Sequence, residues 1–325
     1  MTLRDQMPRT NGLTILAGDI GGTNSRLAIY ERRTRGLALV AQKTYSSAGY
    51  SCVADIISEF LAATGTRCDV VCLGLPGPVR SQTVVHLTNL PWTVDRDRLR
   101  QTAATDRVDL INDVQASAAG VFERPATDFT CLHEGLSDPL GNRAVISLGT
   151  GLGVAGLTPS GRAFATEAGH ASFSPRTEFD LDLLRELSRE YGHVSWERVA
   201  SGPALERIYR SLAPEGSHGL DVPAIVDRAT SDPLCRETLA TFCRYVGSVA
   251  GNISLTMMAT GGIFFCGGVA PKVIDAVGAS PILEALNDKG RMRPVLEKIP
   301  IYLVRDDNLA LTGAAYTAMR RVEWT

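Results

Sequence analysis

Two stretches of the chain share one pattern of apolar and polar positions. Each has an apolar run, a short turn of glycine with threonine, and a second apolar run: LAGDIGGTNSRLAIY over Leu16–Tyr30 and AVISLGTGLGVAGL over Ala144–Leu157. The run after the first turn is too short and too rich in β-formers to open a long helix, so the pattern predicts β-hairpins. A Rossmann fingerprint and a Walker A loop need a helix after their glycines, and both are excluded.

The turns of these hairpins suit the terminal phosphates of a nucleotide. Gly21 and Gly22 can adopt positive φ and let backbone N–H groups approach a ligand, and Thr23 adds a hydroxyl. Asp19, at the strand end, is a candidate for holding Mg²⁺ through water. The alternative is a tight turn with a capping Asp. Two such hairpins in two halves of a chain suggest a duplicated architecture that clamps a nucleotide between the halves.

The rest of the pattern alternates between strands and helices, as is typical of an α/β chain. It predicts strands at 37–45, 69–75, 107–111, 263–266 and 299–304, and helices at 51–64, 96–102, 114–121, 179–191, 224–230, 235–251 and 309–320. Residues 126–143 are expected to be rich in loops. No charged residue occurs from Tyr245 to Pro271, but its glycines and polar residues favour a buried helix and a buried strand over a membrane span.

Composition narrows the class of protein. The 325 residues suggest two domains, and 44% hydrophobic with 21% charged residues is ordinary for a globular chain with a sizeable core. The net charge of −2 gives no electrostatic case for nucleic acid or an anionic membrane as partner. The seven cysteines are scattered without a CxxC pair, which favours free thiols and a cytoplasmic location. The charged N-terminus is not expected to be a secretory signal.

Several polar residues are candidates for chemistry, each with a structural alternative. Asp113 follows the predicted strand 107–111 and begins a helix, so it is either an N-cap or a base whose ionised form the helix N-terminus favours. Glu167-Ala168-Gly169-His170 lacks the pattern of a metal site and is either structural or a set of hydrogen-bonding groups for a polyol. Asn89 lies two residues before Pro91, in a predicted turn. An Asn in such a turn is more often structural than a contact to a ligand.

Seven ordered segments carry a resemblance to a known family. They are GDIGGTNSRLAIY, LINDVQA, SLGTGLGVA, EAGH, HVSWERVASGPAL, FCGGVAPK and DDNLALTGAAY. Together they resemble the bacterial glucokinases that lack the zinc motif of the repressor-type group, from about residue 14 to residue 320. The resemblance implies an α/β chain with the two-domain actin-like ATPase (ribonuclease H-like) fold. A cleft would separate a smaller domain, 1–122 plus 306–325, from a larger α+β domain, 123–305.

The resemblance also implies an activity, the ATP-dependent phosphorylation of glucose at its 6-hydroxyl to give glucose 6-phosphate and ADP. Asp113 would be the general base, and sugar binding would close the domains. The implied substrate residues are Asn89, Asn112, Asp113, Glu167, His170 and Glu197; without the resemblance, Glu197 is an ordinary solvated Glu. The implied ATP-binding residues are Asp19, Gly21, Gly22, Thr23, Asn24, Gly149, Thr150, Gly151, Gly267 and Gly268. Mg²⁺ as cofactor and a homodimer are implied as well.

The sequence leaves rival functions open. Ala168 and Thr166 stand where glycine is common in the family, and Ala168 is expected to crowd the sugar pocket slightly. Another hexose or an amino sugar is therefore an alternative substrate. A non-catalytic sugar sensor of the related repressor group would need a helix-turn-helix, and about a dozen residues before the first motif are too few for one. A chaperone or actin-like ATPase would explain both hairpins but not Asn112-Asp113 together with Glu167–His170.

Overall fold

A computed structural model of the chain describes residues 12–34, 36–79, 83–87, 90–214 and 216–323. The chain divides into two compact units: unit 1 is Met1–Glu123 with Asn308–Thr325, and unit 2 is Arg124–Asp307. Each unit is described by itself. The domains expected at 1–122 plus 306–325 and at 123–305 stay a prediction.

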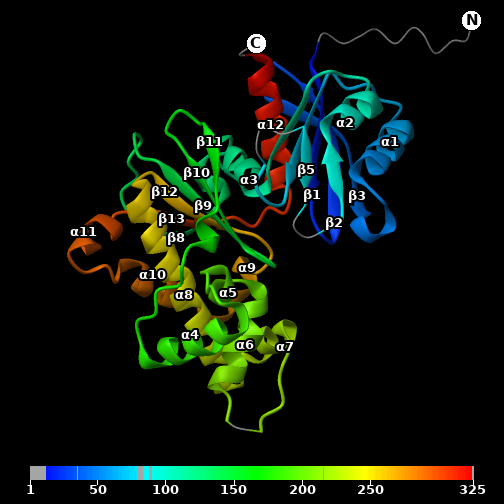
Figure 1. Cartoon of the computed structure of the whole chain (residues 1–325). Helices are drawn as coiled ribbons and strands as arrows, with labels where there is room; N and C mark the ends of the chain where they lie inside the picture. The colour runs from blue at the N-terminus through cyan, green and yellow to red at the C-terminus, as the bar shows by residue number, and fades with distance from the viewer. Residues whose placement is uncertain (1–11, 35, 80–82, 88–89, 215, 324–325) are drawn as a thin grey trace, which may run out of the picture. The chain divides into compact units, whose positions relative to one another are not determined.

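Unit 1 is built on a five-stranded sheet of order β3-β2-β1-β4-β7 (Figure 1). Its strands are β1 (Thr14–Ile20), β2 (Asn24–Arg32), β3 (Leu37–Ser46), β4 (Val70–Leu75) and β7 (Val108–Asn112). The first three strands are antiparallel, whereas β1, β4 and β7 run parallel. The predicted first hairpin and the predicted strands 37–45, 69–75 and 107–111 are therefore confirmed. All six residues of β4 are buried, as an apolar run at the middle of a sheet requires.

Helices cover both faces of this sheet (Figure 1). The helices of unit 1 are α1 (Val53–Thr64), α2 (Arg96–Ala103), α3 (Asp113–Phe122) and α12 (Leu309–Glu323). Apolar residues of α1 and α2 share one buried cluster with the strands, and those of α3 and α12 share another. The C-terminal helix thus returns to pack on the first half of the chain, beside the helix that begins at Asp113.

The crossing of α3 and α12 depends on Gly313. A Cβ atom at this position would lie 1.8 Å from the backbone oxygen of Ala116 and 2.6 Å from the backbone nitrogen of Gly120. Backbone atoms cannot move aside as a flexible side chain does, so the helices would have to separate. The two helices approach closely because this position has no side chain.

We therefore expect Gly313→Ala to destabilise the protein by about 1–3 kcal/mol, despite the gain in helix propensity of up to about 1 kcal/mol. The measurement is the midpoint of urea unfolding. Gly49→Ala is the matched control in unit 1, because a Cβ there meets nothing within 4 Å. Equal midpoints for the two variants would contradict the expectation.

Unit 2 repeats the strand pattern of unit 1 in a six-stranded sheet of order β11-β10-β9-β12-β13-β8. Its strands are β8 (Thr130–His133), β9 (Arg143–Leu148), β10 (Leu152–Leu157), β11 (Ala163–Thr166), β12 (Gly262–Cys266) and β13 (Ile301–Leu303). As in unit 1, three consecutive antiparallel strands are followed by two parallel ones, and β8 is added at the edge. The second predicted hairpin and the duplicated architecture are confirmed by this order.

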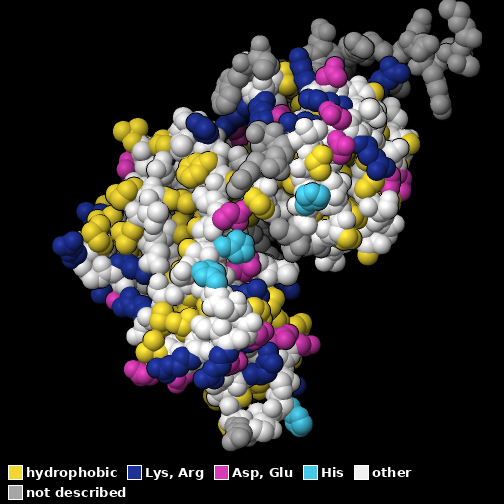
Figure 2. Space-filling view, in the orientation of Figure 1, with side chains coloured by type: hydrophobic (Ala, Val, Ile, Leu, Met, Phe, Trp, Pro, Cys, Tyr) yellow, Lys and Arg dark blue, Asp and Glu magenta, His cyan; other side chains and the backbone are white. Residues whose placement is uncertain are grey.

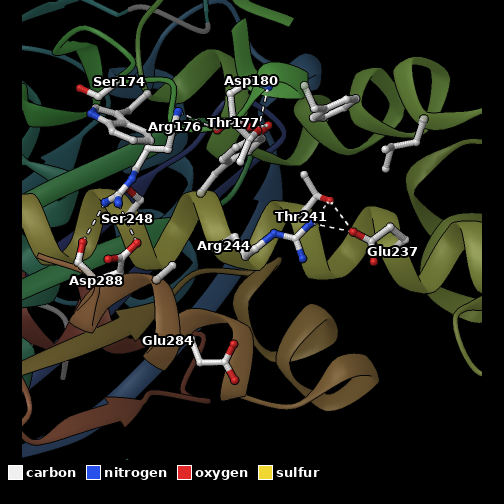
Figure 3. Close-up of a pocket in the computed structure, with 15 residues that line it drawn as sticks. Ser174, Arg176, Thr177, Asp180, Glu237, Thr241, Arg244, Ser248, Glu284 and Asp288 are labelled. Carbon is white, nitrogen blue, oxygen red and sulfur yellow. Dashed lines mark hydrogen bonds and ion pairs between the residues drawn. The ribbon is translucent and has the colours of Figure 1, made fainter. Parts of the chain in front are cut away.

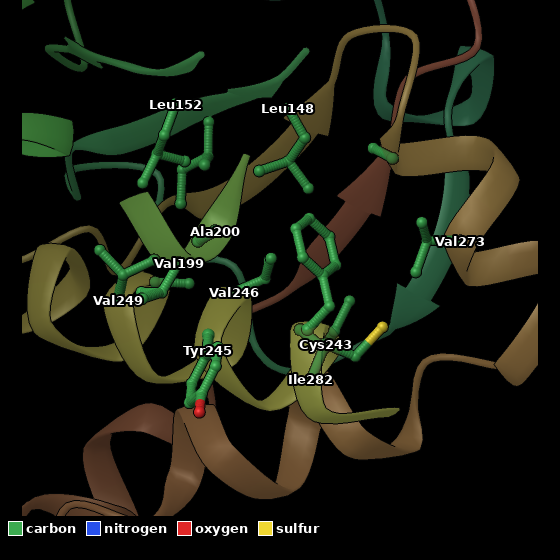
Figure 4. Packing of buried hydrophobic residues seen from close by; sticks show 14 of the residues in the cluster. Leu148, Leu152, Val199, Ala200, Cys243, Tyr245, Val246, Val249, Val273 and Ile282 are labelled. Atoms are coloured by element: carbon green, nitrogen blue, oxygen red, sulfur yellow. The ribbon is translucent and has the colours of Figure 1, made fainter. Parts of the chain in front are cut away.

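A long helix, α8 (Pro233–Met257), organises the core of unit 2. The other helices of the unit are α4 (Glu178–Tyr191), α5 (Glu197–Ala200), α6 (Gly202–Leu212), α7 (Val222–Arg228), α9 (Ala270–Val277), α10 (Ser280–Asn287) and α11 (Arg293–Leu296). Val246 and Val249 of α8 pack with Leu148 and Leu152 from the sheet in one buried cluster (Figure 4). The uncharged stretch 245–271 is therefore the end of α8 and the buried β12. Among the helices of the described residues, none is long and apolar enough to cross a membrane.

Several elements were not predicted from the sequence; besides β11, α6, α9, α10 and α11, they include two short β segments. Residues 126–143, expected to be loop-rich, include the edge strand β8, whose residues are too exposed to leave an apolar pattern. A small hairpin of β5 (Val84–His86) and β6 (Thr93–Asp95) follows β4 and was not predicted, because each strand has only three residues. On the face shown in Figure 2, acidic and basic side chains lie close together. The ion pairs of unit 2 include Arg185–Asp182 and Arg207–Glu190.

Candidate active site

The turn of the first hairpin exposes its backbone to solvent. Gly22, Thr23 and Asn24 are exposed, and Gly21 N–H donates to the Asn24 carbonyl at 2.9 Å. Gly21 and Gly22 do not have the positive φ that was expected. A Cβ on Gly21 would lie 2.8 Å from the Asn24 backbone oxygen, so glycine is needed at this position for the close approach of the two backbone segments.

Ser47 supports this turn from the far end of β3. Its hydroxyl donates to the Gly21 carbonyl at 2.8 Å, and its N–H donates to the Thr23 carbonyl at 2.9 Å. These bonds occupy the carbonyl oxygens of Gly21 and Thr23. With both acceptors occupied, the turn is better suited to an anion.

Asp19 and Arg26 lie opposite each other on the two strands of this hairpin. They are Cα partners, and Arg26 Nη1 lies 3.2 Å from Asp19 Oδ2. Burial raises the pKa of the Asp19 carboxyl, and the nearby Arg26 guanidinium offsets this only in part. A desolvated carboxylate with one cationic partner is a suitable oxygen ligand for a hard cation.

Asn112 and Asp113 occupy the junction between β7 and α3. The structural alternative expected Asp113 to be the N-cap of this helix, but the N-cap is Asn112. Asn112 Oδ1 accepts from the N–H groups of Val114 and Gln115, both at 3.0 Å. Asn112 Nδ2 donates to the Gly77 carbonyl at 3.2 Å. The asparagine therefore has one side-chain N–H left for a substrate, and the half-buried Asp113 begins the helix with its carboxylate at the positive end of the dipole.

In unit 2, the turn Gly149–Gly151 is held by three segments. Gly202 N–H donates to the Gly149 carbonyl at 2.8 Å, and Val269 N–H donates to the Leu148 carbonyl at 3.0 Å. The third contact is Glu197 Oε2, which accepts from Leu152 N–H at 3.0 Å. A Cβ on Gly149 would meet nothing within 4 Å, so one side of the turn stays open for a ligand.

The Gly267–Gly268 segment lies beside this turn, because the parallel strands β9 and β12 end at the same edge of the sheet. Gly267 has a φ of +88°, and a Cβ there would lie 2.5 Å from the Leu148 oxygen. Glycine is required at Gly267 on both counts. Gly268 has open space around it, which leaves room for a flat ligand.

The structure brings Glu167, His170 and Glu197 together in unit 2. His170 Nε2 lies 3.8 Å from Glu167 Oε2, and His170 Nδ1 lies 4.0 Å from Glu197 Oε1. The Glu167 and His170 side chains are 52% and 59% exposed, whereas that of Glu197 is 29% exposed. Ala168 packs partly against the core of unit 2, and crowding of a sugar pocket by it stays a prediction.

Asn89 lies outside the described residues.

A cavity of about 680 Å³ in unit 2 is lined by α4, α8 and α10, and none of the predicted site residues that the structure describes lines it (Figure 3). Two ion pairs lie among its charged side chains: Arg176 lies 2.7 Å from Asp288, and Arg244 lies 2.7 Å from Glu237. This cavity is separate from the predicted chemistry.

The residues thus form two donor turns, each with carboxylates nearby. Unit 1 places Asp19 and Asp113 at the carboxyl ends of β1 and β7, on either side of β4. Unit 2 places the turn Gly149–Gly151 beside the cluster of Glu167, His170 and Glu197, which can both donate and accept hydrogen bonds. Phosphoryl transfer requires such positioning and charge neutralisation, with little covalent work by the protein.

The fold and the two Gly/Thr hairpins define an ATPase of the actin-like fold, and comparisons with known proteins agree. The family model for glucokinase matches residues 16–321. The chain is 36% identical over 312 residues to a glucokinase of Caulobacter vibrioides (strain NA1000 / CB15N), covering 92% of this chain and 93% of that one. A crystal structure of glucokinase from an Antarctic psychrotroph matches with a TM-score of 0.83 at 31% identity, covering 94% and 99% of the two chains.

The chain belongs to the glucokinase family. The expected enzyme class, an ATP-dependent glucose kinase, and the actin-like fold are confirmed. A glucokinase of the ROK family from Streptomyces griseus, crystallised with glucose and AMPPNP, shares the fold with a TM-score of 0.65 at 20% identity, covering 94% of this chain and 99% of that chain.

Proposed function

We propose that Asp113 removes the proton of the glucose 6-hydroxyl as that oxygen attacks the γ-phosphorus of ATP. The new O–P bond forms as the bond between the γ-phosphorus and the bridging oxygen to the β-phosphate breaks, which gives glucose 6-phosphate and ADP. The position of Asp113 at the start of α3, on the same sheet edge as Asp19, is the observation that supports this most directly. A helix N-terminus keeps such a carboxylate ionised, as a base must be.

We propose that both hairpin turns bind the phosphates of ATP. The exposed turn residues Gly22–Asn24 of unit 1 and the open turn Gly149–Gly151 of unit 2 can donate backbone N–H groups. Gly267 and Gly268 would receive the adenosine. The bound AMPPNP of the Streptomyces griseus relative supports a nucleoside triphosphate as co-substrate.

Asp19 fits the role of a carboxylate that holds Mg²⁺ through water. Its carboxylate is largely buried and faces one cation, and among the described residues no group of three or more His, Cys, Asp or Glu side chains is arranged to hold a metal. Mg²⁺ keeps several of its waters and binds substrate phosphates, so a single carboxylate that accepts hydrogen bonds from those waters suffices. When bound, the ion would neutralise charge on the phosphates.

The sugar would be oriented by Glu167, His170 and Glu197 of unit 2, with Asn112 and Asn89 from the other half of the chain. Carboxylates accept hydrogen bonds from hydroxyls, and the histidine and the amide N–H groups donate them. The glucose bound in the Streptomyces griseus relative supports this choice of sugar. A cytoplasmic location and a homodimer stay part of the proposal.

The test is ADP release by the purified protein with Mg-ATP and a panel of glucose, 2-deoxyglucose, mannose, fructose, glucosamine, N-acetylmannosamine and no sugar. We expect strong turnover with glucose and little with the others, because a site built to bind several hydroxyls discriminates by as much as about 10⁴-fold when one is missing. Turnover with another sugar alone would reassign the substrate. Glucose binding without ADP release would indicate a sensor.

A further inference from the structure

Leu152, the first residue after the second phosphate turn, contacts both segments proposed to bind the sugar. Its N–H donates to Glu197 Oε2 at 3.0 Å. A Cβ on Gly169, within the Glu167–His170 segment, would lie 2.0 Å from the Leu152 oxygen, so this segment rests directly on the Leu152 backbone. The end of the phosphate turn is therefore held on one side by Glu197 and on the other by the segment of His170.

Backbone pairing fixes Glu197 in this position. Phe173 N–H donates to the Val194 carbonyl and Trp196 N–H to the Ala171 carbonyl, both at 2.9 Å. The chain before Glu197 therefore runs antiparallel to the chain that follows His170. Glu197 is the first residue of the short helix α5, so its backbone has little freedom to move away from the turn.

The two carboxylate oxygens of Glu197 face different groups. Oε2 is occupied by Leu152 N–H, whereas Oε1 lies 4.0 Å from His170 Nδ1, too far for a direct hydrogen bond. A carboxylate oxygen accepts more than one hydrogen bond. Oε1 thus has capacity for a sugar hydroxyl while Oε2 keeps the turn in place.

We infer that Glu197 is a positioning residue that couples sugar occupancy to the geometry of the phosphate turn, and hence to nucleotide affinity. The inference rests on the proposed function. A sugar hydroxyl that binds Oε1 restricts the rotation of the carboxylate and so restricts the turn that Oε2 holds. Because coupling between two sites is reciprocal, the nucleotide must tighten sugar binding by the same factor.

Gly151 offers a variant that disturbs the contact between the turn and Glu197 while keeping every side chain proposed to bind the sugar. A Cβ at this position would lie 2.6 Å from Glu197 Oε2, the far end of a flexible side chain, so Gly151→Ala displaces the carboxylate and leaves the fold intact. Gly149→Ala is the matched control, because it changes a glycine of the same turn in open space. It can lower nucleotide affinity, but equally with and without glucose.

The experiment is calorimetric titration of Mg-AMPPNP with and without saturating glucose, and the readout is the ratio of the two dissociation constants. For the wild type and Gly149→Ala we expect glucose to tighten AMPPNP binding about fivefold or more, and for Gly151→Ala less than about twofold. Glu197→Ala should lose the coupling as well, and Glu197→Gln should regain part of it because its amide oxygen can accept from Leu152 N–H.

The outcomes separate this inference from the proposed function. If Gly151→Ala and Glu197→Ala keep the wild-type ratio, the coupling runs by another route and the inference is wrong. A wild-type ratio of one would also overturn it, even where glucose is phosphorylated. Wild-type protein that neither binds glucose nor releases ADP in its presence would instead overturn the proposed function.

Discussion

Replacing Asp113 with asparagine is expected to lower kcat by about 10²–10⁴-fold, roughly 3–5.5 kcal/mol of transition-state stabilisation, while glucose affinity changes little. The amide keeps the shape of the side chain and its place at the start of α3, but it cannot accept the proton of the attacking hydroxyl. The measurement is steady-state ADP release at saturating glucose and Mg-ATP, with glucose affinity measured by calorimetry.

The fold should tolerate the Asp113→Asn change. Asn112, not Asp113, caps the helix through two hydrogen bonds, and both remain. Loss of a negative charge in the first turn costs about 0.3–1 kcal/mol, too little to unfold the chain. Asp97→Asn is the matched control, because Asp97 is an exposed first-turn carboxylate of α2 in the same unit. An Asp113→Asn enzyme that turns over within about threefold of the wild type would contradict the base assignment, since a general base contributes far more.

Local pattern was enough to predict most of the elements that carry the site. Both hairpins follow from apolar runs that flank a Gly/Thr turn, and their repetition predicted the duplicated sheet order now seen in units 1 and 2. The pairing of Asp19 with Arg26 could have been found as well. Both residues lie the same number of positions from the turn, so antiparallel pairing must place them opposite each other.

Other features could not be predicted because they depend on contacts between distant segments. Ser47 holds the turn at Gly21 although 26 residues separate the two in sequence, and Glu197 reaches Leu152 across 45. Their sequence contexts are those of an ordinary loop serine and an ordinary helix glutamate. The capping at Asn112 and not Asp113 was missed for another reason: both residue types favour a helix N-terminus, and only the geometry of the β7–α3 junction decides which one caps.

Replacing Asp19 with asparagine is expected to weaken Mg²⁺ binding about 10–100-fold, the usual cost of losing an outer-sphere partner of a metal. The apparent KM for Mg-ATP should rise, because less of the nucleotide is held in the productive metal complex. The measurement is the dependence of ADP release on free Mg²⁺ at fixed ATP. Glu31→Gln is the control: Glu31 lies on β2 of the same hairpin and pairs with Arg33.

The same change should raise the stability of the metal-free protein at neutral pH. Burial raises the pKa of Asp19 above its value in the unfolded chain. A carboxyl whose pKa is raised in the folded protein stabilises the fold at pH values below its pKa in the unfolded chain. This stabilisation is lost as the pH rises through the pKa of the folded protein, so the ionised Asp19 carboxylate lowers stability at pH 7. Asparagine removes that cost, and Arg26, which is 30% exposed, stays hydrated.

Urea unfolding of metal-free wild type and Asp19→Asn across pH tests this expectation. The Asp19→Asn midpoint should be the higher one at neutral pH, and the difference should shrink as the pH falls and the wild-type carboxyl becomes protonated. A variant that is less stable at neutral pH would mean that the Arg26 pair outweighs the burial of Asp19. Weaker Mg²⁺ binding with unreduced stability is the combination expected of a carboxylate that is kept for its chemistry at the expense of the fold.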